Sequence, residues 1–312
     1  MARYGKGVGV SDNQFDNFSP YESPGSMELE LSSGPEDNRP WGPWWSLLWT
    51  FVVVCVWQLA QLAVLLFFAV REMGVEGLTA ESLQEFAEGA MVSGDIVGAV
   101  GFCSGLVGVI LILAIVKVKG VSLSDGLSLK KFRKGWMWLL LLPGWIIGAL
   151  AITVISSLFA KDGAAADQEG IFDLVNGTQN YLWLILGVSV GAPFFEEFLF
   201  RGLLHEGLRQ SFLGPWGSGV IIGILFSAIH MQYQDPSAFV ALFLLGMLFT
   251  AARELTGSLW AAVAIHFIQN TYVTLSMILV ISGAFPEEMV PEELKDLVPD
   301  AVGEEVGLST EK

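Results

Sequence analysis

The chain is poor in charge and in reactive side chains. Only 15% of its 312 residues are charged, and it holds two cysteines and three histidines. So little charge excludes an ordinary soluble domain, in which about 25% of residues are charged. Cys55 and Cys103 both fall in apolar segments, so we expect small buried hydrophobes and neither a disulfide nor a metal cluster. Basic residues number 16 against 32 acidic ones, a balance that argues against nucleic-acid binding.

Apolar sequence, by contrast, is abundant. Hydrophobic residues make up 53% of the chain, and 11 are Trp. Because about 20 helical residues cross the hydrocarbon core, the long apolar runs predict an all-α, polytopic transmembrane helix bundle of about seven spans, within a range of six to eight. These runs lie near residues 44–70, 94–118, 136–160, 181–201, 217–231, 236–252 and 257–283. The fifth and sixth runs are short and could form a tight or partly re-entrant hairpin.

The two ends of the chain differ from the apolar middle. Residues 1–43 are rich in Gly, Ser, Pro and acidic side chains and lack the pattern of a signal peptide, which predicts a disordered cytoplasmic tail. Residues 284–312 contain nine acidic side chains and predict a second solvated tail. We divide the middle into N-terminal membrane helices, 44–180, and a membrane core, 181–283, that carries the polar residues described below.

Basic residues set the expected orientation. Six of the sixteen crowd one short loop: Lys117, Lys119, Lys130, Lys131, Arg133 and Lys134. Cytoplasmic loops are enriched in Lys and Arg, so we expect this loop in the cytoplasm. The expected location of the protein is the plasma membrane. Counting spans outward places the N-terminus in the cytoplasm and the acidic loops 71–93 and 161–180 outside.

Charged side chains interrupt the fourth apolar run at Glu196, Glu197 and Arg201. A charge at the centre of a membrane helix costs about 2.5–3.5 kcal/mol on insertion scales, so the group indicates a functional site with paired or solvated charges. Residues four apart share a helix face, which predicts a Glu197–Arg201 ion pair and leaves Glu196 free. Alternatively, the three residues mark a helix end at the headgroup boundary.

A histidine in the next run is expected at the same depth as Glu196. The breaker at residues 214–217 predicts two antiparallel helices, and Glu196 lies 18 residues before Gly214 while His230 lies 16 residues after it. At about 1.5 Å of rise per residue, the two side chains are at similar heights. We therefore expect this carboxylate and this imidazole to meet, with Phe226 on the face of His230.

The last span adds His266 and Asn270, four residues apart on one face of an apolar helix. The alternative reading is a pair of polar side chains that join helices, as is common in membranes. The third histidine, His205, follows the acidic motif and is expected at the membrane interface. His205-Glu206 begins like a zinc-protease helix, but Arg209 stands where the second histidine is required.

Taken in order, Glu196-Glu197-x-x-x-Arg201, Phe226-x-x-x-His230 and His266-x-x-x-Asn270 resemble the three motifs of the CAAX protease and bacteriocin-processing (CPBP, Abi) family, related to the type II CAAX prenyl endopeptidases. The resemblance covers about residues 181–275. It implies an intramembrane endopeptidase that removes C-terminal tripeptides from prenylated proteins, with Glu196 and His230 activating a water molecule.

Peptide hydrolysis needs a base for the water proton and donors for the developing oxyanion. We assign Glu196 as the general base, His230 as its partner in holding the water, and His266 with Asn270 as oxyanion stabilisers. Three residues are expected to support these four: Glu197, Arg201 and Phe226.

The sequence does not decide whether a cofactor is needed, and it leaves two alternative functions. No cofactor is assigned with certainty; zinc is an alternative, with Glu196, His230 and His266 as ligands and a water in the fourth position. The expected partners are the lipid bilayer and a membrane-associated peptide or protein, either a prenylated CAAX-type substrate or a leader peptide. Two rivals are a proton-coupled transporter that uses the Glu, His and Arg groups as a relay, and a non-catalytic bacteriocin-immunity or scaffold protein.

Overall fold

The computed structural model describes residues 41–161, 164–230, 232–233 and 235–284. Contacts divide the chain into a unit of residues 1–38, which lies outside the described residues, and a unit of residues 39–312, to which all that follows belongs. The two predicted tails, 1–43 and 284–312, also lie outside the described residues apart from 41–43 and 284.

The described part of the chain is helical and contains no strand, which confirms the predicted all-α class. Within the described ranges, six helices are long and apolar enough to cross a membrane, which makes this an integral membrane protein. They are α1 (Pro43–Met73), α3 (Gly94–Val118), η1 with α5 (Gly135–Leu140 and Leu141–Ser157), α7 to α9 (Tyr181–Leu208), α11 (Pro236–Thr256) and α12 (Leu259–Ile281).

Of the two runs predicted to form a short hairpin, only the first is a short helix. Its first helix, α10 (Gly214–Ala228), has 15 residues, whereas its second, α11, extends to 21 residues. α11 begins where the Asp235 side chain accepts a hydrogen bond from the backbone N–H of Ser237, and it ends at Gly257, whose φ of 72° suits glycine. Six spans plus one shorter apolar helix agree with the predicted range.

Three short helices complete the described structure: α2 (Ala80–Met91), α4 (Leu123–Gly126) and α6 (Ala164–Asn176). Of these, α2 falls in the acidic segment that the sequence predicts as a loop. Thr79 and Ser82 exchange side-chain and backbone hydrogen bonds at its start, which is the pattern of a capping box.

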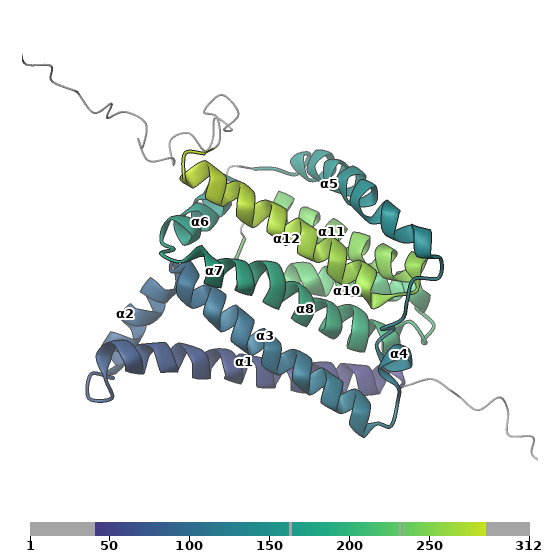
Figure 1. The fold of residues 1–312 in the computed structure, drawn as a ribbon, viewed down its shortest axis with the longest axis horizontal. Coiled ribbons are helices and arrows are strands. Elements are labelled where there is room, and N and C mark those ends of the chain that lie inside the picture. Colours follow the sequence, from purple (N-terminus) through teal and green to yellow (C-terminus); the bar gives the residue numbers. More distant parts are fainter. Residues whose placement is uncertain (1–40, 162–163, 231, 234, 285–312) are drawn as a thin grey trace, which may run out of the picture. The chain divides into compact units, whose positions relative to one another are not determined.

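The composite helix Tyr181–Leu208 is the most buried of the six spans. Figure 1 shows its segments α7 and α8 lying between α1 and α3 on one side and α11 and α12 on the other. Glycines bring it close to α3: a Cβ on Gly187 would collide with the backbone of Gly98, and one on Gly98 would collide with the backbone of Trp183. Such close approach of small residues is how membrane helices pack without a hydrophobic driving force.

Two stretches of this composite helix are π-helical: η2 (Ile185–Gly191) and η3 (Phe198–Leu204). Between them, α8 (Ala192–Glu197) is a single α-helical segment that ends on the two glutamates. π-Helical turns are rare, and they occur frequently at functional sites. The sequence did not predict them.

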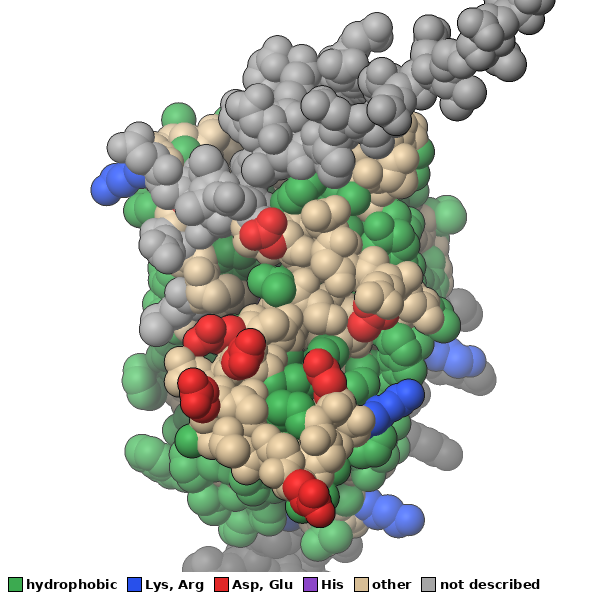
Figure 2. All heavy atoms as spheres, turned by 90° about the vertical axis from the view of Figure 1, so that its left-hand side faces the viewer, with side chains coloured by type: hydrophobic (Ala, Val, Ile, Leu, Met, Phe, Trp, Pro, Cys, Tyr) green, Lys and Arg blue, Asp and Glu red, His purple; other side chains and the backbone are tan. Residues whose placement is uncertain are grey.

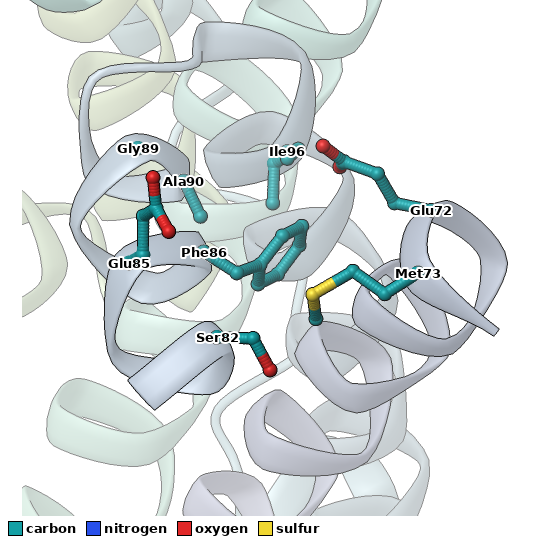
Figure 3. A pocket seen from close by; sticks show the side chains of 8 residues that line it. All are labelled: Glu72, Met73, Ser82, Glu85, Phe86, Gly89, Ala90 and Ile96. Carbon is teal, nitrogen blue, oxygen red and sulfur yellow. The ribbon is translucent and has the colours of Figure 1, made fainter. Parts of the chain in front are cut away.

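The two ends of the bundle carry opposite charges. The acidic end includes exposed Glu72, Glu76 and the α2 glutamates, and Figure 2 shows several carboxylates on this face. At this end, a pocket of about 480 Å³ lies between the end of α1, α2 and Ile96 of α3, and Phe86 is part of its lining (Figure 3). Its lining includes no histidine and none of the predicted site residues, so it is separate from the candidate site.

Both cysteines are free, as predicted. The expectation that both are buried is wrong for Cys55, which is exposed on the outside of α1, while Cys103 is half-buried. The outer face of a membrane helix contacts lipid, so an apolar sequence there does not indicate burial within the protein.

Candidate active site

The predicted ion pair between Glu197 and Arg201 forms in the centre of the bundle. Arg201 Nη1 donates to Glu197 Oε1 at 3.0 Å, and both side chains are fully buried. Arg201 Nη2 donates to the backbone carbonyl of Gly246 on α11 at 2.8 Å. A buried guanidinium needs such partners because leaving it unpaired costs several kcal/mol.

His266 of α12 links the two glutamates. Its Nδ1 lies 2.8 Å from Glu197 Oε1, and because a carboxylate only accepts, Nδ1 donates. The other ring nitrogen, Nε2, lies 3.9 Å from Glu196 Oε2. Glu196 is 15% exposed and its buried Oε2 has no hydrogen-bond partner among the described residues. The imidazole therefore faces one paired and one unpaired carboxylate.

Aromatic rings enclose these charged groups. The Arg201 guanidinium carbon lies 5.0 Å from the Phe226 ring centroid and 5.3 Å from that of Phe249. Phe249 also stacks on His266, with centroids 4.4 Å apart and planes 18° apart. Rings at these distances attract a cation through their π faces and keep water away from it. Phe249 was missed because it is one phenylalanine within an apolar helix, and no sequence signal marks it.

His230 lies just beyond the end of α10, on the other side of Phe226. Its Nδ1 donates to the Phe226 carbonyl at 2.7 Å, and its ring centroid lies 4.9 Å from the Phe226 ring. The Phe226 ring lies 5.9 Å from His266 as well, and so stands in contact with both imidazoles. The expected contact between Glu196 and His230 is not formed among the described residues. The physical reason is that α10 ends at Ala228 and the following turn directs His230 to a backbone carbonyl.

Asn270 lies one turn after His266 on α12. Its Nδ2 donates to the carbonyl of Val188 at 2.8 Å, which joins α12 to the π-helical segment η2. The amide group keeps a second N–H and its carbonyl oxygen for other contacts. The structure thus brings Glu196, Glu197, Arg201 and His266 into one cluster and places Phe226, His230 and Asn270 at its edges.

The donor set does not fit a metal ion in this arrangement. Within the described ranges, no three His, Cys, Asp or Glu side chains are placed so that they could hold one. Of the alternative ligands, Glu196 lies near His266, whereas His230 donates to the Phe226 carbonyl, and the Phe226 ring contacts both imidazoles. Zinc dependence stays a prediction for experiment.

A second buried polar cluster surrounds His205, which is fully buried within the protein. Its expected position at the membrane interface stays a prediction. Its Nε2 lies 3.1 Å from Glu254 Oε1, and its Nδ1 lies 2.9 Å from Ser218 Oγ. Arg253 forms ion pairs with both Glu254 and Glu206. These bonds hold α9, α10 and α11 together at the basic end of the bundle. The pairing across helices makes burial possible, and it could not be foreseen from His205 alone.

Gly246 offers a stability test of this geometry. A Cβ there would lie 3.0 Å from Gly223 Cα and 3.3 Å from Arg201 Nη2. Gly246→Ala is therefore expected to lower the free energy of unfolding by about 1–3 kcal/mol through overpacking. Gly144→Ala, in α5 where nothing lies within 4 Å of the new Cβ, is the matched control and should be neutral or stabilising in thermal unfolding. Equal stability of the two variants would contradict the close contact.

A comparison with known protein families falls on this region. Residues 178–272 match the family described as "Type II CAAX prenyl endopeptidase Rce1-like". An "Uncharacterized 24.3 kDa protein" of Escherichia coli is 28% identical over 131 residues, which are 41% of this chain and 60% of that protein. The chain thus spans somewhat less than two thirds of this relative. No solved structure matches the chain significantly.

Proposed function

From the premise that residues 178–272 form an Rce1-like domain, we propose that the chain is an intramembrane endopeptidase that hydrolyses a peptide bond in a membrane-anchored substrate. The observation that carries the proposal is the unpaired Glu196 carboxylate, 3.9 Å from the nearer ring nitrogen of His266. Both side chains belong to helices that can cross a membrane. Ionisable residues at that depth are expensive to keep without a function.

Glu196 is the proposed general base. A water molecule between Glu196 Oε2 and His266 Nε2 would hydrogen-bond to both atoms. As the water oxygen attacks the peptide carbonyl carbon, Glu196 takes the water proton and the carbonyl π electrons move onto oxygen. The C–N bond then breaks with the proton passing from Glu196 to the leaving nitrogen, so that one water yields one carboxylic acid and one amine.

His266 is the proposed donor to the oxyanion. When both ring nitrogens are protonated, Nδ1 donates to Glu197 and Nε2 donates into the space beside Glu196, where negative charge develops. Asn270 has a further N–H on the same helix face for this role. His230, held by the Phe226 carbonyl, presents its other nitrogen as a second contact for the water or the substrate.

Arg201 lets two carboxylates occupy adjacent positions. It neutralises Glu197, so the group Glu196, Glu197 and Arg201 carries one net negative charge instead of two. Glu197 in turn orients His266 through Nδ1. We propose positioning roles for Glu197, Arg201 and Phe226, because none of them needs to touch the substrate.

The proposed substrate is a prenylated CAAX-type protein or a leader peptide at the membrane surface. The family description supports the first class. Incubating the purified full chain in detergent with membrane-anchored peptides of both classes is expected to give cleavage, and we expect the activity to persist in chelator because the described side chains do not assemble a metal site. Activity lost in chelator and regained with zinc would establish the zinc alternative. Ion transport without any cleavage would contradict the proposal.

We also propose that the basic loop and the N-terminus face the cytoplasm of a plasma-membrane protein, as the excess of Lys and Arg in residues 117–134 supports. In a background without native cysteines, Lys131→Cys is expected to resist a membrane-impermeant maleimide in intact cells, whereas Glu81→Cys in α2 should react. The reverse labelling pattern would overturn this orientation.

A further inference from the structure

An apolar groove of about 590 Å³ lies at the basic end of the bundle, away from the candidate active site. Its walls come from the last turns of α3 and the start of α4, and include Leu113, Ala114, Val121 and Leu123. Lys117 is the one charged side chain among the described residues of the lining. Figure 1 shows α4 close to the end of α3 from which the groove begins.

The groove opens where the membrane surface is expected. α3 is long and apolar enough to span the bilayer, and the groove occupies its last turns. Neighbouring Val118 is 88% exposed. Trp45 of α1 is also exposed, and the Lys119 Nζ atom lies 5.2 Å from the Trp45 ring centroid. Tryptophan and lysine together at a helix end are typical of the headgroup level.

Positive charge is left uncompensated around the groove. Of the six basic residues in the loop, Lys130 pairs with Asp125 at 2.9 Å. A hydrogen bond from Ser122 lowers the pKa of the Asp125 carboxyl, so this pair is charged at neutral pH. Lys117 and Lys119 form no ion pair with any residue that the structure describes. An anion would therefore find the Lys117 ammonium at the apolar wall, and Lys119, whose ammonium lies over the Trp45 ring, follows two residues later in the chain.

We propose that this groove binds an anionic glycerophospholipid, with an acyl chain along the walls formed by α3 and α4 and the phosphate at Lys117 and Lys119. The apolar walls favour a lipid over an acidic peptide segment, which would satisfy the lysines but leave the walls uncovered. Basic pockets at the ends of membrane helices bind anionic headgroups by the same combination of charge and burial.

Native mass spectrometry of the full chain with phosphatidylglycerol or phosphatidylcholine tests this inference. We expect phosphatidylglycerol to remain bound and to raise the melting temperature more than phosphatidylcholine does. Replacing both Lys117 and Lys119 by Gln removes two charges worth about 1 kcal/mol each near a membrane surface, and should weaken phosphatidylglycerol binding roughly 30-fold. Lys161→Gln, an exposed lysine beyond the far end of α5, is the matched control and should bind as the wild type does.

Two further arms keep the test decisive. Lys117→Arg keeps the charge and should retain the lipid, so a folding defect in the double variant would not be mistaken for loss of binding. Glycerol 3-phosphate alone should not raise the melting temperature, because it lacks the acyl chain. Equal retention of the two lipids, unchanged binding by the double variant, or an equal effect of glycerol 3-phosphate would overturn the proposal.

Discussion

Glu197→Ala is expected to lower the free energy of unfolding by about 3–5 kcal/mol, the typical effect of removing one partner from a buried ion pair. The reason is that Arg201 is fully buried and Glu197 is its one carboxylate partner in the described structure. Its remaining contacts are the Gly246 carbonyl and the surrounding aromatic rings. Denaturation of the detergent-solubilised variant, followed by circular dichroism, measures the loss.

Asp125→Ala is the matched control for Glu197→Ala. It also removes one carboxylate from an ion pair, but the Asp125–Lys130 pair is exposed at the basic end. Exposed pairs contribute little because water and salt screen them, so the melting temperature should stay at the wild-type value. Similar stability of the two variants would contradict a dry, central Glu197–Arg201 pair.

Glu196→Gln is expected to lower the rate of peptide cleavage about 10²- to 10⁴-fold, the range for loss of a general base. The amide keeps the size of the side chain but cannot take the water proton. Stability should change little, because Glu196 Oε2 has no hydrogen-bond partner among the described residues. Initial rates on a membrane-anchored peptide, with melting curves for the same preparations, measure both effects.

Glu85→Gln provides the control for this substitution, because Glu85 lines the separate pocket at the acidic end. Its cleavage rate should equal that of the wild type. A Glu196→Gln protein that cleaves as fast as Glu85→Gln would remove Glu196 from the mechanism, whereas a Glu196→Gln protein that fails to fold would indicate a structural role for the carboxylate.

The sequence predicted those features that depend on composition and on short spacing along one helix. Long apolar runs specify membrane helices whatever their packing, and the four-residue spacing of Glu197 and Arg201 specifies their pairing. The height of Glu196 relative to the turn at residues 214–217 was a weaker guide, because equal depth does not determine which faces of two helices meet.

Contacts between helices could not be predicted from the sequence. His266, and not His230, is the imidazole beside Glu196, since α10 ends two residues before His230. The π-helical segments on both sides of α8 change the helix face on which each later residue of the composite helix lies. No local sequence pattern predicts these segments. Phe249 and Gly246 resemble any apolar residues of a membrane helix until the neighbouring helix is in place.

The most direct test of the account is cleavage of a membrane-anchored peptide in H₂¹⁸O, with the wild type and Glu196→Gln compared by mass spectrometry. We expect one ¹⁸O atom in the new carboxyl group of the wild-type product, and almost no product from a folded Glu196→Gln protein. Undiminished, labelled product from the variant would contradict the claim that Glu196 takes the proton of the attacking water.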